Sequence, residues 1–565
     1  MRLHQLFGAT ALLALGAACG TDQSAPAETP TDATAATEDG HAFDPAITAG
    51  DLVEHIATLA SDEFEGRAPG TPGGEKTRAY LAGEYARIGL EPIGDSFEQE
   101  VPIVESTLDP AASSFSVSIN GETQDLEYQK DVVYWSKRIE ENIAFSDSEL
   151  VFVGYGVVAP EYGWDDYDDI DVTGKTVVML VNDPGFATQD PDLFNGNAMT
   201  YYGRWTYKYE EAARQGAAAA IVIHDTAPAA YGWNVVETSW AGPQVDLQRD
   251  DNGASRVAAE AWISNEYARA LFSSAGLDLD NQMQAALQSD FAAVPMTGIT
   301  ASATLTNTIK RSADANLVGV LRGSEAPEEY VLYMGHWDHL GIDPNADGDG
   351  IYNGAVDNAT GIAAILEIAE RFANNETAPR RSILVAAVTA EESGLLGSAY
   401  FAEYPPIPLK QIVGGINIDA MLPTPPVKDM VVVGYGASEL EDILQEAAAP
   451  YARRLTPDPE AEKGYFYRSD HISLAKKGVP MLYADGGGDL VDGGMEAGKV
   501  IGDAYRANDY HQPSDEFSPD WPMEAMVAST EILYETGAAM AYSSAWPNWY
   551  EGNEFRALRD AQRAE

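Results

Sequence analysis

The chain has 565 residues, 45% of them hydrophobic, and this length exceeds what one hydrophobic core usually serves. Its 89 acidic and 34 basic residues give a net charge of −55, which repels nucleic acid and anionic membrane surfaces. The single cysteine, Cys19, excludes a disulfide within the chain and a thiolate metal site. Any transition-metal site must therefore use His, Asp and Glu.

The first residues predict an export signal over 1–18. Arg2 precedes an apolar run that ends at Ala18 and is too short for a comfortable membrane span. The run leads into Leu15-Gly-Ala-Ala-Cys19, which resembles a bacterial lipoprotein processing site, although Gly16 stands where Leu is usual. We favour a lipid anchor at Cys19, as the only membrane contact, over cleavage near Ala18 and full secretion. We expect a protein exported from a bacterial cell, with residues 19–45 as a disordered tether.

Residues 46–111 predict two helices around a Gly/Pro loop, and they form the first part of the main domain. The spacing of Leu52, Ile56 and Leu59 is helical, and a second helix is expected over Glu75–Ile88.

The pattern changes to strands, turns and short helices over residues 112–305, which contain no convergent set of His, Asp and Glu. Expected strands are Glu149–Val158, Lys175–Val181 and Ala217–Ile223, with a helix over Tyr207–Gln215. We interpret this β-rich region as a separate module inserted into the main domain.

Strands and helices alternate again over 306–545, which favours an α/β fold: a mixed, mostly parallel sheet with helices on both faces. The last residues, 546–565, are polar and predict a terminal helix or tail. The expected strands are Ala315–Leu321, Tyr330–Gly335, Ser382–Thr389, Gly415–Ile418, Met430–Gly434 and Pro480–Tyr483, and the expected helices Asn358–Asn374, Leu395–Ala402, Glu439–Ala452, Asp470–Lys477 and Met523–Ala541.

Five stretches of this region place acidic or imidazole groups at expected strand ends or helix starts. Each alone has a plain structural interpretation: Asp357 could cap a helix, a role for which Asn358 competes, and a Glu-Glu pair is usually a solvated loop. Together they predict one site, because the carboxyl ends of parallel strands meet at one sheet edge. The stretches are His336-Trp-Asp338, Asn353-Gly-Ala-Val-Asp357-Asn-Ala-Thr-Gly361, Thr389-Ala-Glu391-Glu392-Ser-Gly394, Ile416-Asn-Ile-Asp419 and Tyr510-His511-Gln-Pro-Ser-Asp515.

Metal-dependent hydrolysis needs such a set of residues. Zinc without cysteine takes imidazole nitrogen and carboxylate oxygen. Two zinc ions about 3.5–4 Å apart can share one carboxylate and hold a hydroxide. A further carboxylate must remain free to act as the general base.

The motifs Gly-His-x-Asp, Gly-Ala-x-Asp-Asn-x-x-Gly, Glu-Glu-x-Gly, Asn-x-Asp and Tyr-His-x-Pro-x-Asp occur here in this order. They resemble the co-catalytic di-zinc exopeptidases, a group with secreted bacterial leucine-type aminopeptidases, glutamate carboxypeptidases and the transferrin-receptor ectodomain. The module at 112–305 resembles a protease-associated (PA) domain at Gly174-Lys-Thr-Val-Val and at Lys208-Tyr-Glu-Glu-Ala-Ala-Arg-Gln-Gly-Ala-Ala. The resemblance implies a zinc-exopeptidase core with an inserted PA-like domain.

The resemblance also implies roles for individual residues. One zinc would be held by His336 and Asp419, the other by Glu392 and His511, with Asp357 bridging both. It implies Glu391 as general base, Asp338 as the group that orients His336 and Tyr510 as a candidate hydrogen-bond donor to the oxyanion. Asp470 and His471 are expected to line or support the site, whereas His339 is assigned to the loop rather than to the ligands.

One loop departs from the family pattern. Asp343-Pro-Asn-Ala-Asp-Gly-Asp349 has the spacing with which a calcium loop starts, so bound Ca²⁺ is one interpretation and an acidic lid the other. The twelfth position is Gly354 rather than Glu, which excludes an ordinary EF-hand.

The leading functional hypothesis is a di-zinc aminopeptidase that acts on peptide substrates. A dipeptidase or carboxypeptidase of the same group is the alternative, and a binding protein that has lost catalysis is a third. Only Lys463 and Arg468 are basic near the motifs, which disfavours a glutamate-preferring carboxypeptidase. The complete ligand set disfavours a non-catalytic protein.

Overall fold

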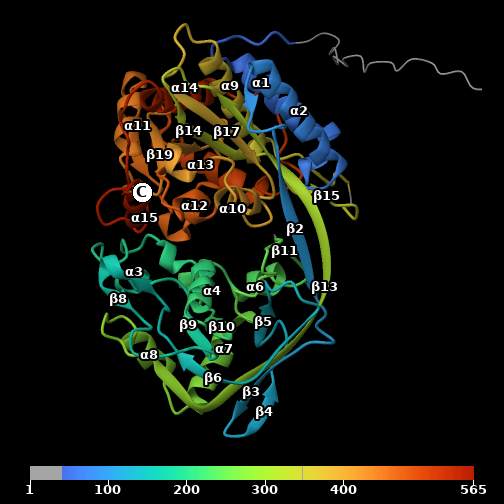
Figure 1. The fold of residues 1–565 in the computed structure, drawn as a ribbon, viewed down its shortest axis with the longest axis vertical. Coiled ribbons are helices and arrows are strands. Elements are labelled where there is room, and N and C mark those ends of the chain that lie inside the picture. Colours follow the sequence, from blue (N-terminus) through green and yellow to red (C-terminus); the bar gives the residue numbers. More distant parts are fainter. Residues whose placement is uncertain (1–40, 347, 565) are drawn as a thin grey trace, which may run out of the picture. The chain divides into compact units, whose positions relative to one another are not determined.

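A computed structural model describes residues 41–346 and 348–564 (Figure 1). The predicted signal peptide, Cys19 and residues 19–40 of the predicted tether lie outside these ranges, so export and acylation stay predictions. No helix in the described ranges has both the length and the apolar character needed to cross a membrane.

The main sheet has four parallel strands at its centre, in the order β17 (Arg381–Val388), β14 (Ala326–His336), β18 (Ile412–Asn417) and β21 (Met481–Gly486). The flanking strands make the sheet mixed, because β13 pairs antiparallel with β17 and β19 pairs antiparallel with β21. The outer strands are β13 (Val294–Leu321), β2 (Glu98–Leu108), β11 (Pro243–Leu247), β1 (Glu91–Pro92), β19 (Asp429–Val433) and β20 (Arg454–Pro457).

Helices cover both faces of this sheet because successive strand residues point to opposite sides. Val331 and Tyr333 of β14 belong to one hydrophobic cluster, whereas Leu332 and Met334 belong to another. The first cluster includes residues of α1 (Ala49–Leu59), α2 (Pro72–Ile88), α9 (Gly361–Ala373), α11 (Leu440–Ala448) and α14 (Glu524–Ala541); the second includes residues of α10 (Leu396–Glu403) and α12 (His471–Ala475). The predicted α/β fold class is confirmed.

The inserted region has a second sheet and its own hydrophobic clusters. Val178 and Leu180 of β9 pack in one cluster, and Val177 and Met179 in the other. Whether this region is a PA domain stays a prediction. Its parallel strands are β6 (Asn142–Phe152), β9 (Thr176–Leu180), β10 (Ala219–Ile223) and β12 (Ala259–Ile263), flanked by β5 (Val132–Trp135), β3 (Ser114–Ile119) and β4 (Glu122–Asp125).

The long strand β13 joins the two sheets. Its first half pairs with β3 and β6 of the insert, and its last residues pair with β17 of the main sheet (Figure 1). The sequence predicted only the end of this strand.

The remaining elements are β7 (Val158–Ala159), β8 (Trp164–Asp165), β15 (Gly341–Ile342), β16 (Ile351–Tyr352), α3 (Pro184–Thr188), α4 (Trp205–Arg214), α5 (Thr226–Ala229), α6 (Trp233–Ser239), α7 (Asn265–Ser274), α8 (Leu279–Ala285), α13 (Gly494–Asn508) and α15 (Arg556–Ala564).

Two predicted boundaries differ from the structure. The strand expected up to Val158 ends at Phe152, because Gly154 and Gly156 adopt φ values of +56° and +63° that break the extended chain. The helix expected from Asn358 begins at Gly361, because the Asn358 side chain accepts a hydrogen bond from the Gly361 amide.

The C-terminal segment, predicted as a helix or tail, contains α15 and packs against the main domain. Trp549 is fully buried and donates to the Gly478 carbonyl, and Arg559 donates to the Ile412 carbonyl.

Candidate metal centre

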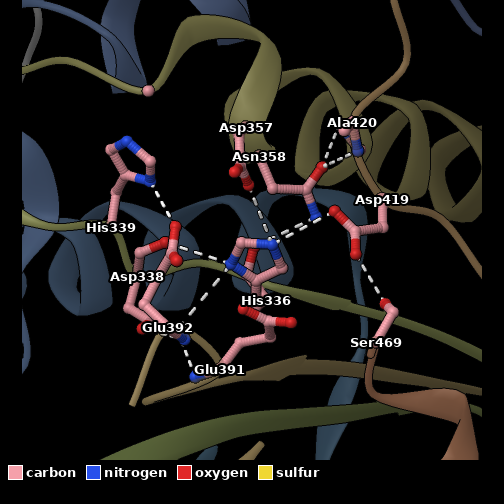
Figure 2. Close-up of polar contacts among 12 residues, drawn as sticks. His336, Asp338, His339, Asp357, Asn358, Glu391, Glu392, Asp419, Ala420 and Ser469 are labelled. Carbon is pink, nitrogen blue, oxygen red and sulfur yellow. Dashed lines mark hydrogen bonds and ion pairs between the residues drawn. The ribbon is translucent and has the colours of Figure 1, made fainter. Parts of the chain in front are cut away.

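Three parallel strands end at one edge of the main sheet, and acidic or imidazole side chains stand at each end. β14 ends at His336, β17 is followed by Glu391 and Glu392, and β18 is followed by Asp419. Asp357 reaches the same place from the turn before α9, and Figure 2 shows these side chains converging. The sheet edge therefore collects the groups that the sequence places far apart.

The converging side chains form two groups that share Asp357. In the first, Nε2 of His336 lies 3.2 Å from Oδ1 of Asp357 and 3.2 Å from Oδ1 of Asp419. In the second, Nε2 of His511 lies 3.2 Å from Oδ2 of Asp357 and 3.1 Å from Oε2 of Glu392. Asp357 thus turns one oxygen toward each group, as a bridging ligand would.

The spacing of these donors suits zinc. Zinc binds imidazole and carboxylate at about 2.0–2.2 Å, so two ligands of one tetrahedral ion stand about 3.3 Å apart. The four separations of 3.1–3.2 Å in the two groups are close to this value. Each group therefore has nitrogen and oxygen donors at a spacing that one metal ion could occupy.

His336 is fixed so that Nε2 faces the carboxylates. Its Nδ1 lies 3.1 Å from the backbone carbonyl of Asp338 and donates to it. The Asp338 carboxylate, expected to orient His336, is 3.9 Å from that Nδ1 and instead accepts from the backbone amides of Glu391 and Glu392. Asp338 thus links the His336 loop to the Glu391–Glu392 turn.

The site is rich in negative charge, and this charge shifts the pKa values of the ligands. Burial alone lowers the pKa of His336, but Glu391 and Asp419 outweigh it and raise the pKa well above the ordinary value. Burial alone raises the pKa of Asp357, but hydrogen bonds from His336 and His511 bring it well below its usual range. The excess of carboxylates in this site favours the binding of cations.

Glu391 differs from Asp357 and Glu392, whose pKa values burial would raise but hydrogen bonds from imidazoles lower. Burial raises its pKa well above the usual glutamate value, and the charges of Glu392 and Asp419 add to this rise. The side chain lies beside His336 in Figure 2. A carboxylate that holds a proton tightly next to a metal group can take a proton from water and pass it on.

Residues around the site adopt left-handed backbone conformations that side chains rarely take. Ala390, Ala420 and His511 have φ values of 53°, 56° and 57°. The Ala420 amide donates to Oδ1 of Asn358, and the Asn358 amide group donates to the Ile418 carbonyl. Side-chain hydrogen bonds thus hold the turns that aim Glu391 and Asp419.

Comparison with known proteins identifies the segment that carries this site. Residues 316–534 match the model of Peptidase family M28. This segment is an M28 peptidase domain. It contains all five predicted ligands together with Glu391.

Curated relatives agree with this assignment. A probable zinc metalloprotease of Pyrenophora tritici-repentis is 38% identical over 103 residues, which cover 18% of this chain and 23% of the relative. Aminopeptidase NAALADL1 of Mus musculus is 31% identical over 139 residues, covering 22% of this chain and 17% of the relative. The chain therefore matches less than a quarter of the length of these relatives.

Two solved structures cover more of the chain at lower identity. An aminopeptidase from Aneurinibacillus sp. strain AM-1 is 17% identical and covers 88% of this chain and 94% of its own, with a TM-score of 0.44. A zinc aminopeptidase from Bacillus subtilis is 16% identical and covers 90% and 100%, with a TM-score of 0.41.

The M28 domain also uses residues beyond the predicted ligands and base. Nδ1 of His339, assigned to the loop, lies 2.6 Å from Oε1 of Glu392. Ser469 donates to Oδ2 of Asp419 at 2.5 Å. The fully buried Arg67, which no motif marked, donates to the carbonyls of Trp337, Leu59, Asn353 and Gly354.

Other expected site residues lie at different depths. Tyr510 is 45% exposed and stacks on His511, with ring centroids 3.9 Å apart. Asp470 and His471 are fully buried, and the His471 ring packs between Phe466 and Tyr483. A role for Tyr510 at the oxyanion and for Asp470 and His471 in substrate binding stays a prediction.

The acidic loop lies between β15 and β16. Oδ1 of Asp343 accepts from the Asn345 amide, and Oδ1 of Asp349 accepts from the Ile351 amide. Asp347 lies outside the described residues, so the Ca²⁺ interpretation stays a prediction.

Proposed function

We propose that this protein is an aminopeptidase that holds two zinc ions and releases N-terminal residues from peptides. The main support for the proposal is that Asp357 belongs to both groups of side chains, with one oxygen 3.2 Å from His336 and the other 3.2 Å from His511. His336 and Asp419 would hold one zinc, and Glu392 and His511 the other. Bound zinc would supply an activated hydroxide and polarise the scissile carbonyl.

Glu391 is the proposed general base. Its high proton affinity and its place beside His336 suit it to take the proton of the attacking water and to give it to the leaving amine. Tyr510, next to His511 at the open side of the site, is the proposed donor to the oxyanion.

A Glu391→Gln variant tests the base. Glutamine keeps the size of the side chain but cannot accept the proton, so turnover should fall roughly 10²–10⁴-fold. Zinc content, measured by elemental analysis, should stay at the wild-type value. Unchanged hydrolysis would remove Glu391 from the mechanism, and fewer than one zinc per wild-type chain would refute the paired site.

A substrate screen separates the proposed aminopeptidase from its alternatives. Aminoacyl reporters, N-blocked peptides and C-terminal dipeptide substrates are compared with and without chelator. We expect chelator-sensitive cleavage of the free-amine reporters only. Preference for the dipeptide or blocked substrates would instead support a dipeptidase or carboxypeptidase.

We also propose export with a lipid anchor at Cys19, supported by the apolar run before the only cysteine and by the net charge of −55. Cell fractionation tests this: a Cys19→Ala variant should move from the membrane to the soluble fraction, and an unchanged distribution would contradict the anchor.

A further inference from the structure

We infer that His339 is a positioning residue for the zinc proposed at Glu392 and His511. Nδ1 of His339 lies 2.6 Å from Oε1 of Glu392, while the other oxygen of that carboxylate lies 3.1 Å from Nε2 of His511. His339 therefore occupies one oxygen of Glu392 and leaves the second oxygen for metal. The inference rests on the proposed two-zinc function.

The distances separate a hydrogen-bond donor from a metal ligand. Ligands of one zinc stand about 3.3 Å apart, and the four ligand pairs of the site lie at 3.1–3.2 Å. The 2.6 Å contact between His339 and Glu392 is shorter than any of these and has the length of a charge-assisted hydrogen bond. A ring nitrogen of His339 also lies within 4.8 Å of carboxylate oxygens of Asp357 and Glu392, but the much shorter contact assigns the ring to Glu392 rather than to the metal.

The His339 ring is held by packing as well as by this contact. Its side chain is fully buried, and its Nε2 forms no hydrogen bond with the described residues. A Cβ at Gly354 would stand 2.5 Å from Cδ2 of the ring, so glycine there leaves the space that the ring fills. The Arg67 side chain donates to the Gly354 carbonyl, and the backbone carbonyl of Arg67 accepts from the His339 amide. The ring can therefore present only Nδ1 to Glu392.

The first ligand group has a matching contact. Ser469 donates to Oδ2 of Asp419, whose Oδ1 faces His336 (Figure 2). Each non-bridging carboxylate thus gives one oxygen to its group and the other to a fixed donor. The donors come from opposite sides of the site, so removing one of them should affect one metal position only.

The test compares His339→Phe, which fills the space without a donor, with His339→Asn, whose side-chain N–H can replace Nδ1. Zinc affinities are measured by chelator competition on the full chain. His339→Phe should weaken one of two zinc positions about 10- to 100-fold, and His339→Asn should restore most of this affinity. Ser469→Ala, the matched control, should weaken the other position.

Two results would overturn the inference. Wild-type affinity at both positions in His339→Phe would show that the donor is dispensable. Complete loss of one zinc in both His339 variants would make His339 a ligand. Circular dichroism checks folding, and His339→Ala replaces the Phe variant under the same criteria if that variant does not fold. Fewer than one zinc in the wild-type protein would instead refute the proposed function.

Discussion

The main sheet and the inserted sheet both bury carboxylates near the ends of parallel strands, but they treat the charge differently. In the M28 domain, Asp357, Glu392 and Asp419 face imidazoles, and their separations from those rings are ligand separations. The nearby cation, Arg67, directs its N–H groups to backbone carbonyls, and its charge also attracts Asp357 and Glu392. The direct partners of these carboxylates are thus imidazoles, with Ser469 as a further donor to Asp419.

The inserted sheet supplies both the cation and the donors. Asp183, which follows β9, accepts from the Gly185 amide and from Thr200, and Asp166 accepts from Val157 and Trp164. Lys208 of α4 is fully buried, and its charge attracts both aspartates. Buried acids held by fixed amide and hydroxyl donors stabilise a fold, whereas buried acids that face imidazoles at ligand spacing leave room for a metal.

The largest expected effect comes from Asp357→Asn. One oxygen of the bridge becomes an NH₂ group that cannot bind metal, so the paired site loses a ligand to at least one zinc. We expect hydrolysis to fall below detection and zinc content to drop by at least one ion per chain, as measured by elemental analysis. Asp166→Asn in the insert is the control. It should lower thermal stability and leave the zinc content unchanged.

Much of this comparison could be anticipated from the sequence because strand patterns and motif order are local signals. The strands around His336 and Glu391 read as apolar runs, and the following acids stand where parallel strands end. The helix α13 was missed because it contains glycines and buries only Gly498, so it has no buried apolar face. The length of β13 was missed because the exposed residues 310–313 separate its alternating first part from its buried end.

The roles of His339 and Arg67 could not be predicted, because both depend on contacts between distant segments. His339 stands three residues after a ligand in an irregular loop, and only the folded chain brings it to Glu392. Arg67 lies in a Gly/Pro loop 270 residues before the Trp337 carbonyl that it binds. The spacing of residues in a sequence indicates the structure of one helix or strand, whereas the contacts of His339 and Arg67 each join two segments that are distant in the sequence.

Lys208→Met, with the second-largest expected effect, removes the buried cation of the insert. Burial lowers the pKa of Lys208 to about 7, and Asp183 and Asp166 oppose this shift. Lys208→Met leaves both aspartates and the Tyr155 carbonyl without this partner, so the free energy of unfolding should fall by about 3 kcal/mol. Urea unfolding followed by fluorescence measures the loss, and zinc content should not change.

A surface lysine of the insert provides the matched control for Lys208→Met. Lys175 pairs with Glu149, whose side chain is 69% exposed, so Lys175→Met should lower the free energy of unfolding far less than Lys208→Met. Equal losses in the two variants would contradict the claim that burial of Lys208 makes its charge important.

The smallest effect is a pH dependence in the M28 domain. Burial lowers the pKa of His471 to about 3, so the folded protein keeps this ring neutral while the unfolded chain protonates it below about pH 6.5. Because the unfolded state then binds more protons, stability from this group is present above pH 6.5 and falls as the pH drops toward 3. Between pH 7 and pH 5 the loss should be about 2 kcal/mol. His471→Phe, which fits between Phe466 and Tyr483, should remove this part of the loss in urea unfolding at the two pH values.

In the insert, Nε2 of His224 donates to the Tyr231 carbonyl, which favours the protonated ring and opposes the lowering of its pKa by burial. His224→Phe should therefore change the pH dependence less, and an equal change in both variants would contradict the assignment to the buried ring of His471.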